Sequence, residues 1–215
     1  MSDLSKRTYK YYIKSSFKIL GFELLLELIL IIEWLLMGTD ESLIEYISRM
    51  FIMCGGLIGV LTNGIYAMYG PSLYDGLVLS MGGRRKEIFW GQIIKQIIYV
   101  GGNSLVLLIV ATFVHRPIFY YYILGTAVVG FLFGAAGLVI GHKVKKHGKM
   151  IIFIIIICCA GIGGGIGGAA AMDSNQALLN MISGVPAIAY LPIAGLIYVA
   201  LEVWVYKLNK SMMVR

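Results

Sequence analysis

The sequence contains few charged residues. Of its 215 residues, only 13% are Asp, Glu, Lys or Arg, whereas 59% are hydrophobic. Charged residues make up about a quarter of a typical soluble domain, so this composition excludes an ordinary soluble protein and predicts an integral membrane protein. The net charge of +7 does not indicate nucleic-acid binding, because the cations lie in short clusters between apolar runs and form no continuous basic face.

Residues that form disulfides or hold metals are also scarce. The three cysteines all lie inside apolar runs, where we expect free thiols. The three histidines are split between loops, and the spacing of His142 and His147 places them on different helix faces, which is poor geometry for a metal. We therefore expect no metal site.

Motifs for nucleotide hydrolysis and for intramembrane catalysis are missing. The pair Gly148-Lys149 does not complete a phosphate-binding loop, because the spacing is wrong and Met150 replaces the required hydroxyl residue. A membrane protease would need a paired nucleophile, a metal or an acid pair at membrane depth, and three glutamates on one helix do not supply it. We expect no enzyme activity, and also no secretory signal, because no small-residue cleavage site follows the first apolar run.

Six apolar runs are long enough to cross a bilayer, which takes about 20 residues in a helix. The sequence therefore predicts an all-α polytopic membrane protein with one transmembrane domain over residues 1–215. Its six spans are predicted at 17–37, 49–69, 88–114, 118–141, 150–171 and 187–206. Three further segments are an N-terminal interfacial helix at 4–16, a connecting segment at 71–87 between the second and third spans, and an external amphipathic helix at 174–183.

The distribution of cations predicts the orientation of these spans. If both termini lie on one side, that side receives 16 of the 18 Lys and Arg residues, and only Arg49 and Arg116 fall elsewhere. Because cytosolic loops of membrane proteins are enriched in Lys and Arg, both termini are predicted to be cytosolic in a cell membrane.

Several polar residues interrupt the predicted spans. Glu23, Glu27 and Glu33 fall within about a third of the circumference of the first span, at roughly 100° per residue. They either form a polar stripe toward a partner helix or a substrate path, or, for the outer two, reach water at the interfaces. Glu27 lies nearest the middle of the span, which favours a functional role. Asn63 and Asn103 are added to the candidate substrate path, although a helix–helix hydrogen bond is the simpler role of Asn63.

The fourth span carries a stripe of glycines at spacings of 4, 3 and 4 residues. These are Gly130, Gly134, Gly137 and Gly141. Small residues on one helix face allow another helix to approach closely, so this face is predicted to pack on a helix of the same subunit or of a second one.

One stretch, Leu79–Gly91, differs from the rest of the chain. A Gly82-Gly83 break precedes three cations at 84–86, and two aromatic residues, Phe89 and Trp90, follow. Such a loop could be an ordinary cytosolic loop, because these collect Arg and Lys. Its residue order instead indicates a cytosolic elbow that enters a membrane helix.

The order resembles a signature found after the second helix of small six-helix ABC-2-type transporter permeases, especially those of Gram-positive bacteria. The matching residues are Leu79, Ser80, Gly82, Arg85, Lys86, Glu87, Phe89 and Gly91. Arg84 departs from the pattern, since relatives commonly have Thr or Ser there. The hydroxyl that would cap the next helix is therefore missing, and we expect Gly83 to take its place less effectively.

The resemblance implies an ABC-2 permease fold of the type V exporter kind and the function of a permease subunit. It implies a dimer of such subunits, identical or different, with two separate ATPase subunits that hold ATP and Mg, while this chain holds no cofactor. The residues implied to couple to the ATPase are Ser80, Gly82, Arg84, Arg85, Lys86, Glu87 and Phe89.

The glutamate stripe suggests a cationic cargo for such an exporter. Antimicrobial or bacteriocin-like peptides are the first expectation, and hydrophobic drugs are the second. The alternative is a membrane immunity or sensor protein that transports nothing, which would stand without an ATPase gene beside its own.

Overall fold

The computed structural model describes residues 3–37, 43–114, 117–148 and 187–210, and every element in these ranges is helical. The elements are α1 (Asp3–Met37), α2 (Leu43–Tyr69), the π-helical turn η1 (Gly70–Tyr74), α3 (Asp75–Ser80), α4 (Arg85–Val114), α5 (Pro117–His147) and α8 (Ala187–Lys210). The predicted fifth span, 150–171, and the predicted external helix, 174–183, lie outside the described residues.

Helix α1 is longer than the sequence analysis predicts. The predicted interfacial helix, 4–16, and the predicted first span, 17–37, form one continuous helix of 35 residues. The sequence changes from basic to apolar near residue 17, which alters the surroundings of the helix. No proline lies in residues 3–37 to interrupt its backbone hydrogen bonds. At about 1.5 Å per residue the helix is roughly 52 Å long, which exceeds the apolar thickness of a bilayer.

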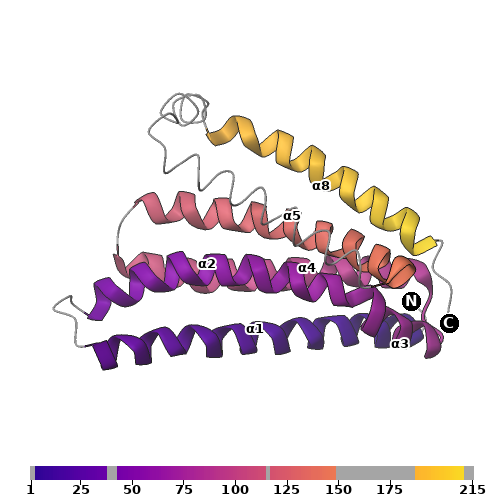
Figure 1. Ribbon diagram of the computed structural model, residues 1–215, viewed down its shortest axis with the longest axis horizontal. Coiled ribbons are helices and arrows are strands. Elements are labelled where there is room, and N and C mark those ends of the chain that lie inside the picture. The colour runs from indigo at the N-terminus through magenta and orange to yellow at the C-terminus, as the bar shows by residue number, and fades with distance from the viewer. Residues whose placement is uncertain (1–2, 38–42, 115–116, 149–186, 211–215) are drawn as a thin grey trace.

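The long helices run side by side, and α8 crosses the bundle at an angle (Figure 1). Helix α2 packs mainly on α5, α1 packs mainly on α4, and α8 packs on α5 and α4. The first residues of α1 and α4 and the last residues of α8 lie together with α3 at one end of the bundle. We call residues 70–86, which include the first two residues of α4, the elbow, and we call this end of the bundle the elbow end.

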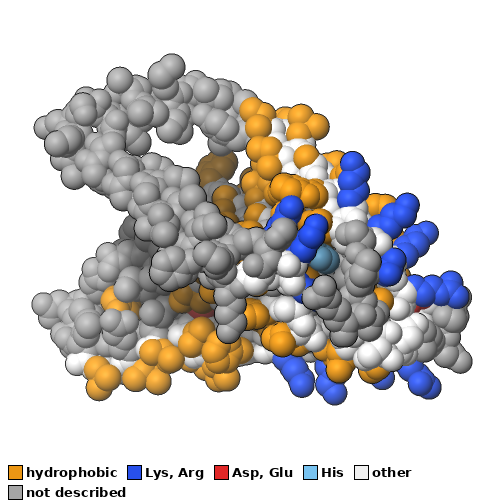
Figure 2. Space-filling model, turned by 45° about the vertical axis from the view of Figure 1, so that its right-hand side comes forward, with side chains coloured by type: hydrophobic (Ala, Val, Ile, Leu, Met, Phe, Trp, Pro, Cys, Tyr) orange, Lys and Arg blue, Asp and Glu red, His pale blue; other side chains and the backbone are white. Residues whose placement is uncertain are grey.

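Polar and apolar side chains are distributed in the opposite way to a soluble protein. Fully buried side chains include Glu23, Glu27 and Gln96, whereas Phe22, Leu25 and other large apolar residues are exposed along α1 and the other long helices. Within the part of the chain that the structure describes, three helical segments are long and apolar enough to cross a membrane, namely Arg85–Phe113, Phe119–Lys146 and Leu191–Lys210. Together these features are those of a membrane protein. Figure 2 shows Lys and Arg side chains gathered on one half of the visible face and hydrophobic side chains exposed elsewhere.

The glycine stripe of α5 lies against α2 at its C-terminal half. A methyl group added at Gly137 would collide with the carbonyl oxygen of Gly64, and one added at Gly141 would collide with that of Met68. At Gly134 it would lie 2.5 Å from the Asn63 side-chain nitrogen, whereas at Gly130 the nearest atom would be at 3.5 Å. The two backbones therefore approach most closely at Gly137 and Gly141, and this contact is within one chain.

Candidate functional site

The elbow reverses the chain through a short sequence of breaks. Pro71 lies at the start of η1, where the backbone no longer follows the α-helical pattern of α2. Helix α3 then ends in a Schellman motif, in which the amide of Gly82 donates to the carbonyl of Leu79 and the amide of Gly83 donates to that of Val78, at 3.0 and 2.9 Å. Gly82 has a φ of 87°, a conformation that favours glycine. This explains physically why the Gly82-Gly83 pair precedes the cations.

The start of α4 is capped by a side chain from inside the helix. The amide of Arg84 donates to Glu87 Oε2 at 3.0 Å, and the Ser5 hydroxyl donates to Glu87 Oε1. Arg84 therefore occupies the cap position, and Glu87 reaches back to it as in one half of a capping box. The expectation that Gly83 caps this helix is wrong, because Arg84 is the cap residue. Glu87 accepts from the amide of Arg84 and also connects α4 to α1 through Ser5.

The three elbow cations project from the protein surface. Arg84, Arg85 and Lys86 are all exposed, and the Arg85 guanidinium donates a hydrogen bond of 2.9 Å to the carbonyl of Lys210 at the end of α8. The Phe89 ring packs edge-on against Tyr206 of α8, with 5.2 Å between the ring centroids. Two of the predicted coupling residues, Arg85 and Phe89, thus lie at a contact between α4 and α8. Ser80 is exposed, and its hydroxyl bonds only the local carbonyl of Leu77, at 2.7 Å.

A buried polar network lies directly behind the elbow. The Tyr12 hydroxyl donates to Asp75 Oδ1 at 2.6 Å, and Gln92 Nε2 donates to Asp75 Oδ2. Asn209 Nδ2 in turn donates to Gln92 Oε1 at 3.1 Å. The side chains of Asp75, Gln92 and Asn209 are all almost fully buried. The network connects α1, α3, α4 and α8, so the elbow cannot shift without disturbing three long helices.

Burial dominates the electrostatics of Asp75. It raises the pKa of this carboxyl above its usual range, while the hydrogen bonds from Tyr12 and Gln92 and the positive charge of Lys95 act in the opposite direction. The Lys95 ammonium itself lies 3.6 Å from the centre of the Tyr66 ring, within the range of a cation–π interaction. The acid is therefore held by neutral donors and by a nearby cation.

Two members of the predicted glutamate stripe, Glu23 and Glu27, are buried inside the bundle between α1, α2 and α4. A methyl group added at Gly55 would lie 2.5 Å from Glu27 Oε1, and one added at Gly59 would lie 2.6 Å from Glu23 Oε1. The glycines of α2 thus leave room for both carboxylates. Among the described residues, no oxygen of Glu23 or Glu27 has a hydrogen-bond partner. Because a buried ionised carboxylate without partners is costly, this pair is suited to take up a proton, a cation or water.

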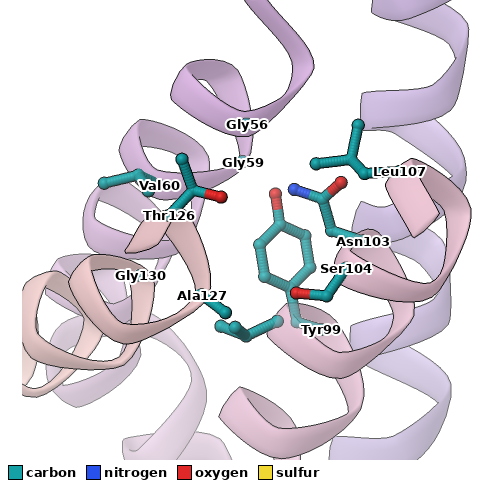
Figure 3. A pocket seen from close by; sticks show the side chains of 11 residues that line it. Gly56, Gly59, Val60, Tyr99, Asn103, Ser104, Leu107, Thr126, Ala127 and Gly130 are labelled. Atoms are coloured by element: carbon teal, nitrogen blue, oxygen red, sulfur yellow. The ribbon is translucent and has the colours of Figure 1, made fainter. Parts of the chain in front are cut away.

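A small polar cavity opens beside the glutamates. Tyr99 and Asn103 point into it from α4, and Gly56, Gly59 and Thr126 contribute to its wall from α2 and α5 (Figure 3). Its volume is about 10 Å³, which is room for about one water molecule. The Tyr99 hydroxyl interacts electrostatically with Glu23 without a well-formed hydrogen bond. Within the described helices, Glu23 and Glu27 therefore lie beside a small interior space.

The remaining predicted path residues lie in the same interior. Asn63 donates to the carbonyl of Gly130 at 2.9 Å, which is the helix–helix hydrogen bond that the sequence analysis named as its simpler role. Asn103 adjoins Gly59, since a methyl group there would overlap its amide nitrogen. Glu33 falls within α1, but its side chain lies outside the described residues.

Sequence reasoning missed several buried polar residues. Asp75 and Gln92 form the centre of the network behind the elbow, and Gln96 donates to Glu202 Oε1 of α8 at 3.5 Å. One signal was available in the sequence. The α4 positions 92, 96, 99 and 103 are spaced by 4, 3 and 4 residues, which places Gln, Gln, Tyr and Asn on one face of an otherwise apolar helix.

No protein-family model, curated protein or solved structure matches this chain.

Proposed function

We propose that this chain is the transmembrane permease subunit of an ATP-driven ABC exporter in a bacterial cell membrane. In this proposal the chain crosses the membrane six times with both termini in the cytosol. A separate ATPase subunit hydrolyses ATP with Mg, and two such subunits act on a dimer of permeases. The exported substrate is a peptide or a hydrophobic compound, and the glutamate pair favours a cationic peptide.

The observation that supports this proposal best is the construction of the elbow. Three exposed cations stand beside a short helix, α3, whose Asp75 is bonded to Tyr12 of α1 and to Gln92 of α4. A partner that binds the cations therefore pulls on an element that is fastened to the bundle. A rigid connection of this kind is what a coupling element requires to convert closure of an ATPase into movement of membrane helices.

ATP binding then changes the relative stability of two conformations. One is the closed interior seen here, and the other opens the space around Glu23 and Glu27 to the substrate. The ATPase can shift this equilibrium only because it binds the elbow differently in the two states. In the open state a cationic group of the substrate binds the two carboxylates, which have no hydrogen-bond partner among the described residues in the closed state.

The proposal is tested by reversing the charge of the elbow. The tagged chain is purified from its native membrane with its ATPase, and substrate-stimulated ATP turnover is measured. Arg85→Glu together with Lys86→Glu should abolish both co-purification and stimulated turnover. Because Arg85 also bonds the carbonyl of Lys210, the single change Lys86→Glu is measured beside it.

The matched control reverses one cation elsewhere on the chain. Lys146 is exposed near the end of α5, so Lys146→Glu gives the same change in net charge as Lys86→Glu. Lys145 is left unchanged, because its charge acts on Asp75 of the elbow. This control should keep the ATPase bound. Retention of the ATPase and of its stimulated turnover in the elbow variant would reject the coupling role.

A second candidate function is a membrane immunity or sensor protein that transports nothing. The enclosed interior, with room for about one water beside Tyr99 and Asn103, favours it. Export is measured with labelled cationic peptide and inside-out vesicles that contain the chain and its ATPase. ATP-dependent accumulation supports the permease, whereas peptide binding without accumulation supports the sensor.

A further inference from the structure

A second and larger cavity lies between α1, α2 and η1, next to the elbow. Its volume is about 250 Å³, many times the roughly 10–15 Å³ that one water needs. The lining residues come from three elements and are Tyr11, Lys14, Ser15, Lys18, Ile19, Tyr66 and Tyr74. The cavity is distinct from the enclosed space beside the glutamates and from the exposed elbow cations.

The chemistry of this cavity is positive and rich in hydroxyl groups. Lys14 and Lys18 lie one helical turn apart on α1, and both are exposed. None of the residues that line the cavity is acidic. The nearest carboxylate on the adjoining elbow, that of Asp75, is buried and turned to Tyr12 and Gln92. The positive charge of the two lysines is therefore not neutralised from within the cavity.

Aromatic contacts fix the shape of the inner wall. The Tyr66 and Tyr74 rings lie 5.2 Å apart between centroids, and the Ser15 hydroxyl is hydrogen-bonded to that of Tyr66. The buried Lys95 side chain packs on the Tyr66 ring next to the cavity and helps to hold that ring in place. The wall is thus preformed, with hydroxyl donors at fixed positions and ammonium groups at the opening.

The position of the cavity along α1 places it at the boundary between water and lipid. The exposed residues before it are basic, whereas large apolar residues such as Phe22 and Leu25 are exposed after it. Tyrosines concentrate at this level of a membrane protein, and lysines there extend toward the headgroups. A cavity of this composition at this depth faces lipid phosphate groups directly.

We propose that this cavity binds the phosphate group of an anionic lipid. Lys14 and Lys18 supply the charge, the Ser15 and tyrosine hydroxyls supply hydrogen bonds, and the acyl chains lie along the apolar face of α1 that begins at Phe17. Ammonium groups are effective phosphate binders as point charges. The site does not depend on the transport function, since it is present whichever partner binds the elbow.

The test measures lipid binding to the purified full-length chain. Native mass spectrometry counts the molecules of phosphatidylglycerol retained, and phosphatidylcholine of the same chain length serves as the neutral comparison. Lys14→Gln with Lys18→Gln should weaken retention by about fivefold for each lysine lost, because one basic residue near an anionic surface contributes a factor of that order. Phosphatidylcholine retention should not change.

The matched control removes the same charge from the same helix. Lys6 and Lys10 are exposed on α1 and do not line the cavity. Lys6→Gln with Lys10→Gln therefore loses as much nonspecific attraction for anionic lipid as Lys14→Gln with Lys18→Gln, but leaves the cavity intact. Equal loss of phosphatidylglycerol in both variants would overturn the proposal. A third variant, Ser15→Ala, keeps the charge and should weaken binding by a smaller factor.

A final arm identifies the source of the phosphate. Inorganic phosphate is added at millimolar concentration and the thermal midpoint is compared with that in short-chain phosphatidylglycerol. A rise with the lipid alone supports a lipid headgroup as the ligand. A rise with both supports phosphate recognition without a need for acyl chains, and no rise with either overturns the site.

Discussion

The hydroxyl of Tyr12 donates to the carboxylate of Asp75 across 2.6 Å, although 62 residues separate them in the chain. This bond fastens the N-terminal helix to the elbow between α2 and α4. Because both partners are buried, the loss of either one leaves the other without compensation from water. The contact is therefore the most sensitive point in the connection between the elbow and the bundle.

Removing the Tyr12 hydroxyl should loosen the elbow. Tyr12→Phe keeps the ring between Val78 and Ile88 and leaves Asp75 with one side-chain donor fewer. A buried acceptor without its partner costs about 1–3 kcal/mol, so the thermal midpoint should fall and the elbow should be cut faster by trypsin at its cations. Tyr121→Phe is the control, since this ring is 72% exposed; equal behaviour of the two variants would contradict the prediction.

The raised pKa of Asp75 predicts a dependence of stability on pH. When burial raises the pKa of a carboxyl in the folded state, its contribution to stability is complete below the usual pKa and is lost as the pH rises through the folded value. Asp75→Asn should therefore reduce the fall in thermal midpoint that accompanies a rise in pH above about 4, the usual pKa of Asp. Lys95 and Lys145 act on this carboxyl in the opposite direction, and a fall of the same size in both proteins would show that Asp75 does not contribute.

The contact between α2 and α5 should reject even one methyl group at its closest point. Gly141→Ala places a methyl group against the carbonyl of Met68, whereas Gly130→Ala meets only ordinary contacts beyond 3.5 Å. Overpacking costs about 1–3 kcal/mol, so the first variant should melt at a lower temperature in detergent. The second should be unchanged or slightly more stable, because alanine favours the helix. If Gly130→Ala melted at a lower temperature than Gly141→Ala, the prediction that α2 and α5 are closest at Gly141 would be contradicted.

Neutralising Glu27 should affect stimulation of the ATPase by cationic peptides without lowering the stability of the protein. Glu27→Gln keeps the shape of the side chain beside Gly55 and removes a charge without a partner among the described residues. Assembly and thermal midpoint should be retained or improved, since the cost of burying the charge is gone. ATPase stimulation by cationic peptides should fall more than stimulation by neutral compounds. Equal loss for both, or none for either, would reject a charge-reading role.

The sequence predicted the helices of this chain better than their connections. The third predicted span, 88–114, differs from α4 only at its start, because its apolar run is long and its end is well marked. The start was missed by three residues because the charged residues 85–87 belong to the helix but precede the apolar run from which the span was predicted. The continuity of α1 was missed because composition reports the environment of a segment and not whether its backbone is interrupted.

The network behind the elbow could not be predicted from local patterns. Asp75 bonds residues 63 positions before it and 17 positions after it, and Asn209 bonds Gln92 from the far end of the chain. Such pairs depend on how the helices pack, which hydrophobic periodicity does not specify. In contrast, the clustering of Glu23 and Glu27 on one face follows from helical geometry alone.

Because α1 is one continuous helix, a movement at one of its ends is transmitted along its whole length. Tyr12, at the elbow end, and Glu27, deep in the interior, lie on the same rod at a separation of roughly 22 Å, at about 1.5 Å per residue. A rigid tilt of about 10° around one of these points would move the other by roughly 4 Å on that geometry. A pull on the elbow therefore needs no relay of side chains to reach the buried carboxylates, because the backbone hydrogen bonds of one helix carry the displacement.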